Sequence, residues 1–208
     1  MLSIDYEFTK KSEGGNKLIG YVPVCDSKSV ANKKNSICFG KDVGTVIGKS
    51  GVTIGAGFDL GQNKLYDLQQ LRLPPGLQIK LMPYLFKIKN DAVDLLQNQP
   101  LVISEYEAAI INERKKEAHA RILQKRFNTY SKLKFENLSS EVQTVLFSIT
   151  YQYGINATKT TLYSLWLAAL KQDYKEMIKV LKSFETYKDR RNSEAKLIEK
   201  MILNTTIN

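Results

Sequence analysis

The sequence predicts an α+β fold that is mostly helical, with a small β-rich lobe over about residues 14–61 and a helical lobe formed by residues 1–13 and 62–208. Short apolar runs bounded by glycine fill the first lobe, whereas apolar residues recur every three or four positions after residue 62. The 208 residues suffice for a single domain. With 43% hydrophobic and 25% charged residues, the composition is that of a globular protein and excludes a disordered or collagen-like chain.

The elements before residue 62 are expected to be short. A helix over residues 3–12 is predicted to begin at Ser3 and to end at the Gly14-Gly15 pair. Strands are predicted over residues 18–24, 43–47 and 52–58, the last two joined as a hairpin by the turn-forming residues 48–51. Alternation of apolar residues along 52–58 places Thr53 on the face opposite Val52. The polar segment 25–42 has no period and is predicted to be an inserted loop.

Helices account for the rest of the chain. Ser104 and Glu107 form a predicted capping box that opens a long, charged helix to about Phe127, on which His119 is expected to be solvated. The run around Trp166 is apolar nearly all round and is expected to be buried. The predicted helices cover residues 63–73, 76–82, 90–98, 104–127, 140–153, 161–170, 173–184 and 190–203.

A net charge of +10 suggests an anionic partner. Residues 1–100 carry +4 and residues 101–208 carry +6, so we expect no separate basic tail. Charge alone allows nucleic acid, an anionic membrane face or an anionic wall polymer. The sequence contains no run of about 18 apolar residues, so no transmembrane segment is predicted. Residues 1–20 lack the apolar core of a signal peptide.

The two cysteines, Cys25 and Cys38, flank the predicted loop. They are either free thiols, as is usual in a reducing compartment, or a disulfide that closes this loop. With His119 as the single histidine, they cannot supply four zinc ligands, so we expect neither a metal nor a cofactor.

Three polar residues lie at predicted element ends in the β-rich lobe: Glu13 before two glycines, Asp59 at the end of an apolar run, and Thr53 six residues earlier. Hydrolysis of a glycosidic bond requires a carboxylic acid that protonates the leaving oxygen and a second carboxylate that acts at the anomeric carbon. A threonine hydroxyl can hold the attacking water. Carboxylates at turns are also common as capping or solvated groups, so this spacing alone leaves both interpretations open.

Longer motifs resemble the phage-type lysozymes, and most of all the branch that includes the killing domain of the bacteriocin pesticin. The matching pieces run from about residue 8 to 203: Ser-Glu-Gly-Gly at 12–15, Gly-Tyr-Val-Pro at 20–23, Gly-Lys-Ser-Gly-Val-Thr-Ile-Gly-Ala-Gly-Phe-Asp-Leu-Gly-Gln at 48–62, Phe-Ser-Ile-Thr-Tyr-Gln-Tyr-Gly at 147–154 and Arg-Arg-Asn-Ser-Glu-Ala at 190–195. The resemblance implies a lysozyme-like fold with a cleft between the two lobes. The segment 25–42 departs from it, because it lengthens the stretch between Glu13 and Thr53.

The resemblance also implies a muramidase that cleaves the β-1,4 bond between N-acetylmuramic acid and N-acetylglucosamine in peptidoglycan with inversion. Glu13 would be the general acid, Asp59 the base and Thr53 the residue that orients the water. In this geometry the two carboxyl groups should lie about 6.5–9.5 Å apart. We expect substrate contacts from Gln62, Tyr21 and Tyr153.

The expected partners are peptidoglycan and the anionic bacterial envelope, with an immunity protein as a further candidate and no nucleic acid. We expect a monomer that acts in the periplasm or cell wall after release, injection or import, as an endolysin, a bacteriocin or a secreted effector. A catalytically inactive wall-binding module on the same fold is the alternative. The Arg190-Arg191 pair either meets buried acids or simply covers the surface, and its place at a helix start, which the helix dipole does not favour, makes a specific anionic partner a further candidate.

Overall fold

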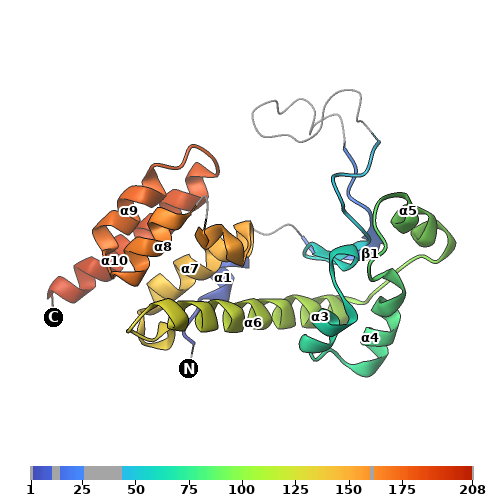
Figure 1. Cartoon of the computed structure of the whole chain (residues 1–208), viewed down its shortest axis with the longest axis horizontal. Coiled ribbons are helices and arrows are strands. Elements are labelled where there is room, and N and C mark those ends of the chain that lie inside the picture. Colours follow the sequence, from blue (N-terminus) through green and yellow to red (C-terminus); the bar gives the residue numbers. More distant parts are fainter. Residues whose placement is uncertain (1, 11–14, 26–43, 160–161, 208) are drawn as a thin grey trace. The chain divides into compact units, whose positions relative to one another are not determined.

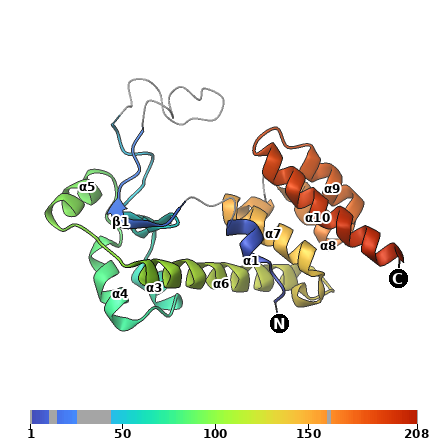
Figure 2. The ribbon, with the colours of Figure 1, turned by 180° about the vertical axis from the view of Figure 1, so that it is seen from behind.

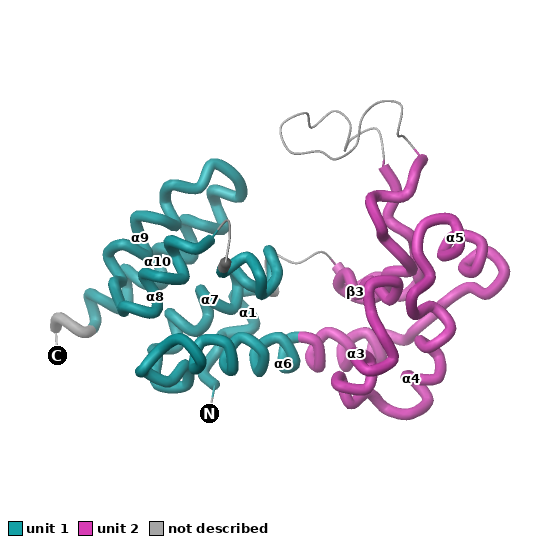
Figure 3. The backbone as a smooth tube through the Cα atoms, in the orientation of Figure 1, with its two compact units in different colours: residues 1–13, 116–208 teal, residues 14–115 magenta. Residues whose placement is uncertain are grey.

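The computed structural model describes residues 2–10, 15–25, 44–159 and 162–207. The chain divides into two compact units, one of residues 14–115 and the other of residues 1–13 and 116–208 (Figure 3). The division falls within the long helix α6 (Glu105–Tyr130), which therefore contributes residues to both units. The lobe boundary expected at residue 61 stays a prediction; the unit with the sheet also holds the helices up to Lys115.

A three-stranded antiparallel sheet in the order β1-β2-β3 lies in the unit of residues 14–115. It consists of β1 (Lys17–Tyr21), β2 (Thr53–Gly55) and β3 (Phe58–Asp59). The prediction of one strand over 52–58 is wrong, because the chain reverses between β2 and β3. Gly55 and Gly57 adopt φ values of +62° and +80°, a left-handed conformation that glycine enters without a steric penalty. The reversal pairs Thr53 with Asp59 and Ile54 with Phe58.

The predicted hairpin between residues 43–47 and 52–58 is also wrong. In the described residues 44–47, Val46 makes an isolated bridge to Val24, and β2 pairs instead with the distant β1. The other edge of β1 is met by residues 101–103, where the Gly20 amide donates to the Leu101 carbonyl at 2.8 Å. Every residue of β2 is buried. The sheet forms by pairing between β1 and β2, which are far apart in the sequence, and a local pattern does not reveal such pairing.

Short helices complete this unit around the sheet (Figure 1). The capping box is confirmed: the Ser104 amide donates to Glu107 Oε2 at 2.8 Å, and the Glu107 amide donates to Ser104 Oγ at 3.1 Å. The predicted helices agree with the observed ones to within a few residues. The observed short helices are α3 (Leu65–Gln70), α4 (Pro75–Leu81) and α5 (Lys89–Asn98), together with the 3-10 turns η2 (Leu60–Gln62) and η3 (Met82–Tyr84), which the sequence did not predict.

The described elements of the other unit are helical. The helices α8, α9 and α10 lie side by side in both ribbon views (Figures 1 and 2). Trp166 is buried and packs edge to face on Phe127, as the apolar run predicts. The elements are α1 (Tyr6–Lys10), the end of α6, η4 (Phe135–Asn137), α7 (Ser140–Tyr153), η5 (Ile155–Lys159), α8 (Tyr163–Leu170), α9 (Tyr174–Lys182) and α10 (Lys188–Ile207).

The first helix begins later than predicted. Asp5, not Ser3, lies at its start, where the Asp5 carboxylate accepts the Phe8 amide at 3.0 Å. The Ser3 amide instead donates to the Gln143 side chain on α7 at 2.9 Å. Tertiary contact with a buried glutamine has therefore replaced the local cap that the sequence suggested.

The structure also bears on the expectations for His119 and Cys25. His119 is half-buried, not solvated: its Nε2 lies 2.9 Å from Thr150 Oγ1, and its ring meets Phe147 and Tyr151 edge to face. Cys25 is disulfide-bonded and 4% exposed, which resolves its alternatives in favour of the bonded state. Cys38 and the remainder of the predicted inserted loop lie outside the described residues.

Candidate active site around Asp59

Asp59 lies at the point where β3 ends and η2 begins. Its carboxylate accepts the Gly51 amide at 3.1 and 3.3 Å and the Gly61 amide at 3.0 Å. The bond from the Gly61 amide caps η2, since the residue that precedes a helix normally accepts an amide of its first turn through its side chain. Asp59 is thus held by the backbone of two segments, and its carboxylate has a fixed orientation.

Gly51 and Gly61 make this arrangement possible by bringing two backbone segments unusually close. A Cβ atom on Gly51 would lie 2.5 Å from Gly61 Cα and would also collide with the Lys87 carbonyl oxygen. A Cβ atom on Gly61 would meet Lys87 and Gly51 in the same way. The two glycines are therefore required by close backbone approach, and the approach directs both amides at Asp59.

The electrostatic environment of Asp59 contains opposing effects. Burial raises the pKa of the Asp59 carboxyl above its ordinary value, because water no longer solvates the anion fully. The backbone N–H groups of Gly51, Gly61 and Gln62 and the Lys115 ammonium group lower this pKa. The net result is a half-buried carboxyl with a raised pKa, which is available as a base once it is ionised.

Thr53 lies directly opposite Asp59 across the β2–β3 pair. Its side chain is 4% exposed, and its hydroxyl donates to the Gly51 carbonyl at 3.2 Å. This bond uses the hydroxyl proton and leaves the oxygen lone pairs as acceptors. Thr53 can therefore receive a hydrogen bond from a water molecule beside Asp59.

The remaining predicted site residues fall into different parts of the chain. Gln62 is exposed, and its side chain donates to the Lys49 carbonyl in the same loop region as Asp59. Tyr21 ends β1 with 37% of its surface exposed. Tyr153 belongs to the other unit, where it ends α7 and meets the Tyr187 ring edge to face. Glu13 lies outside the described residues.

Arg190 and Arg191 belong to a buried ionic cluster in the unit that contains α7 and α10. Glu194 is fully buried and accepts hydrogen bonds from Ser148 Oγ at 2.5 Å and Arg191 Nη2 at 2.7 Å. Arg190 Nε lies 3.5 Å from the same carboxylate. Burial raises the pKa of Glu194 and lowers that of Arg191, while their mutual attraction opposes both shifts. The two arginines therefore meet a buried acid.

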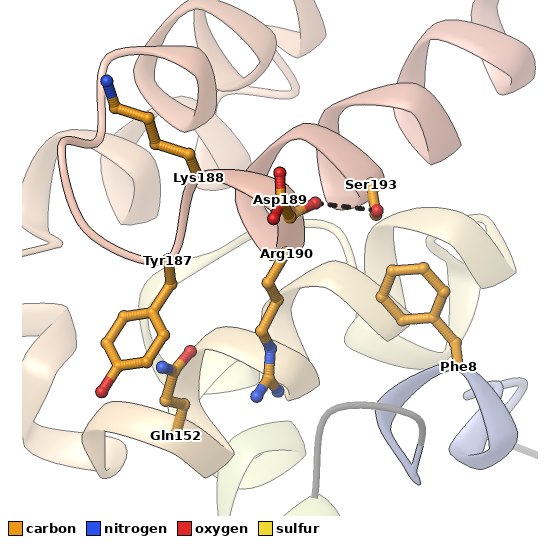
Figure 4. Close-up of a pocket in the computed structure, with 7 residues that line it drawn as sticks. All are labelled: Phe8, Gln152, Tyr187, Lys188, Asp189, Arg190 and Ser193. Carbon is orange, nitrogen blue, oxygen red and sulfur yellow. Dashed lines mark hydrogen bonds between the residues drawn. The ribbon is translucent and has the colours of Figure 1, made fainter. Parts of the chain in front are cut away.

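Arg190 also lines a pocket of about 520 Å³ in this unit (Figure 4). Its Nη2 donates to Ser148 Oγ at 2.8 Å and to the Ser148 carbonyl at 3.1 Å, which fixes the guanidinium at the pocket wall. The sequence drew attention to Arg190 because it adjoins Arg191, but it did not indicate the pocket, which forms between residues of separate helices. The lining residues are Phe8, Gln152, Tyr187, Lys188, Asp189, Arg190 and Ser193.

Neither a metal cluster nor a membrane helix is found in the part of the chain that the structure describes. No three His, Cys, Asp or Glu side chains there lie close enough together to hold an ion. None of the helices there combines the length and the apolar character needed to cross a bilayer.

The mostly helical α+β fold with its small antiparallel sheet is that of a lysozyme-like protein. Residues 3–175 match the Pesticin family, described as a bacterial toxin homologue of phage lysozyme, C-terminal part. The match covers most of the chain, which therefore belongs to this family. No curated protein matches the sequence. Family membership supports a glycoside hydrolase of the lysozyme type that acts as a bacterial toxin.

Proposed function

We propose that the chain is a muramidase that cleaves the β-1,4 bond between N-acetylmuramic acid and N-acetylglucosamine in peptidoglycan. One observation carries this proposal within the family assignment: the Asp59 carboxylate is fixed by two glycine amides, and Thr53 is the residue paired with Asp59 across the β2–β3 strands. A base and a residue that orients water are the groups needed on the water side of the scissile bond. Family membership over residues 3–175 supports the substrate class.

In the proposed mechanism, Glu13 is the general acid and gives its proton to the glycosidic oxygen as the bond to the anomeric carbon breaks. Asp59 accepts a proton from a water molecule that Thr53 holds, and the water oxygen bonds to the anomeric carbon from the opposite face. The product hydroxyl therefore has the inverted configuration. Burial helps Asp59 in this role, since a base with a raised pKa binds the transferred proton more strongly.

Gln62, Tyr21 and Tyr153 are the proposed substrate contacts. Tyr21 and Gln62 are exposed in the unit that holds Asp59, so they are accessible to a polysaccharide chain. We further propose a monomeric toxin or endolysin that acts in the periplasm or cell wall after release, injection or import. Its +10 charge favours the anionic envelope, and an immunity protein would be a partner of a toxin.

The test is the loss of turbidity of purified peptidoglycan, with release of soluble muropeptides, by the wild type, Glu13→Gln and Asp59→Asn. Both substitutions should lower the rate at least about 100-fold, since each removes a proton-transfer group. Asp94→Asn is the matched control, because Asp94 is an exposed acid of the same unit and should leave the rate unchanged. Retained lysis by Glu13→Gln would contradict the assigned acid.

The stereochemical outcome is a separate test. Proton NMR of the first product formed from a soluble glycan should show the α anomer before mutarotation. Initial appearance of the β anomer would contradict the role of Asp59 as the base of an inverting reaction. Wild-type protein that binds several kinds of wall but cleaves none would favour the alternative of an inactive wall-binding module.

A further inference from the structure

The face of the sheet that is turned away from the core carries exposed apolar side chains on β1. Gly20 faces the core, because a Cβ atom built on it would lie 2.9 Å from Leu101 Cβ and 3.2 Å from Val52 Cγ1, and both of these residues are buried. Successive residues of a strand point to opposite faces. Ile19 and Tyr21 therefore point away from the core, in agreement with their exposed fractions of 66% and 37%.

Ile19 has an apolar partner on the segment that flanks β1. Two backbone hydrogen bonds between β1 and residues 101–103, 2.8 and 2.9 Å long, lie on either side of the opposed residues Ile19 and Val102. Residues opposed in this way exchange no hydrogen bond themselves, and their side chains approach more closely than in the other type of pair. Val102 is 57% exposed, whereas its neighbours Leu101 and Ile103 are buried. Ile19 and Val102 thus form an exposed apolar pair.

The same face of the sheet holds the candidate base. Thr53 pairs with Asp59 across β2 and β3, and with Tyr21 across β2 and β1. Residues that pair across strands share a face, so these three residues lie next to one another on successive strands. Neighbouring strands lie about 4.8 Å apart, which places β1, with Tyr21 and Ile19, about 10 Å from β3. We call Tyr21, Ile19 and Val102 the outer patch.

The chemistry of the outer patch fits a carbohydrate better than an added strand. The backbone of β1 is hydrogen-bonded to β2 on one side and to residues 101–103 on the other, so a ligand meets side chains at this face. A sugar ring presents C–H groups, and its N-acetyl substituent presents a methyl group. Both gain free energy when they leave water for contact with tyrosine or aliphatic side chains.

We propose that the outer patch is a glycan subsite, in which the Ile19–Val102 pair binds a sugar more than one ring away from the scissile bond by apolar contact. This inference rests on the proposed function, since a polymeric substrate extends beyond the bond that is cleaved. Apolar contact with a remote sugar is equal in the ground state and the transition state. The subsite therefore strengthens substrate binding and leaves the rate of bond breaking unchanged.

Binding can be measured by isothermal titration calorimetry of the full-length Glu13→Gln variant with peptide-free glycan strands from amidase-treated peptidoglycan. The further substitutions Ile19→Thr and Val102→Thr together should weaken binding about 3- to 10-fold, because each replaces apolar surface by a hydroxyl group. Threonine keeps the β-branched shape that suits a strand. Val102→Thr alone, with an expected loss of about 2- to 3-fold, serves the same purpose if the double variant does not fold.

Ile79→Thr in the same background is the matched control. Ile79 is 69% exposed and belongs to the same unit, but it lies on α4 and outside the sheet. The same chemical change at this position should leave glycan binding unchanged. Equal weakening by Ile79→Thr and by the double variant would overturn the inference, because the effect would then not belong to the outer patch.

Steady-state kinetics with Glu13 intact give the second measurement. The Ile19→Thr/Val102→Thr variant should raise the KM for long glycan strands by the same factor as the loss of binding, with kcat unchanged. An oligosaccharide that spans only the sugars next to the scissile bond should be cleaved as by the wild type. Unchanged binding and KM on long strands would overturn the inference, while lysis by the wild type would still support the proposed function.

Two other outcomes separate the inference from its alternatives. Weaker glycan binding by the double variant of a protein whose wild type cleaves no wall would overturn the proposed function and leave the subsite standing. Analytical ultracentrifugation tests whether a second copy of the chain occupies the patch instead. A wild-type dimer that the double variant abolishes, with glycan binding unchanged, would overturn the inference.

Discussion

Glu194 illustrates how a single residue can determine the stability of one unit of the molecule. Its carboxylate has no exposed surface and is shared by Arg190 and Arg191, while Ser148 donates a further hydrogen bond. Removing ionised groups from water is unfavourable, and this arrangement tolerates burial because each partner compensates the charge of another. The cluster fixes the start of α10 against α7 in a defined register.

Glu194→Ala should lower the free energy of unfolding by about 3–5 kcal/mol, since it leaves a buried arginine without its counter-ion. Urea denaturation followed by circular dichroism measures this change. The matched control is Glu199→Ala on the same helix, where Glu199 pairs with Lys182 on the surface and the expected loss is below about 1 kcal/mol. Equal losses in the two variants would show that the buried cluster does not stabilise the fold.

At the scale of an element, the loop geometry around β2, β3 and η2 depends on glycines with different tasks. Gly55 and Gly57 reverse the chain, whereas Gly51 and Gly61 allow two backbone segments to approach. The second task bears directly on the site, because both amides bind Asp59. A side chain at either position must displace one donor from the carboxylate.

Gly61→Ala should therefore lower both the stability and the proposed lytic rate. The added methyl group collides with backbone atoms of Lys87 and Gly51, and we expect a loss of about 2 kcal/mol or more in the free energy of unfolding. Gly76→Ala is the control: nothing lies within 4 Å of its Cβ position and it sits in α4, so alanine should stabilise by about 0.5–1 kcal/mol. A tolerated Gly61→Ala with normal lysis would contradict the role given to close approach.

For the whole molecule, the dominant property is a net charge of +10, distributed over both halves of the chain. Attraction between this charge and an anionic envelope acts over distances that dissolved salt shortens to about 10 Å at 0.1 M. Charge then affects how fast the protein meets its substrate, while the bond-breaking step depends on local groups.

Binding to intact cell walls should accordingly weaken as ionic strength rises from about 0.01 to 1 M. A sedimentation assay with the non-hydrolysing Glu13→Gln variant measures binding alone. Walls from which the acidic polymers have been extracted provide the control and should bind with much less dependence on salt. Salt-independent binding to intact walls would show that the charge serves another partner.

Features that depend on the local order of residues could be predicted without the structure. Capping at Ser104, the 3.6-residue period of α7 and the apolar run around Trp166 each involve residues within a few turns of one another, so the predicted helices agree with the observed ones. The family motifs likewise selected Thr53 and Asp59, which the structure pairs directly. The role of Glu13 stays a prediction.

Arrangements that join distant segments could not be predicted in this way and are seen in the folded chain. Alternation along 52–58 suggested one strand, but pairing with β1 and two left-handed glycines make it a hairpin. The cap expected at Ser3 and the solvated His119 were wrong for the same reason, since each residue meets a partner on α7. A local pattern records only near neighbours, whereas Asp59 is half-buried and hydrogen-bonded because the folded chain brings the Gly51 and Gly61 amides to its carboxylate.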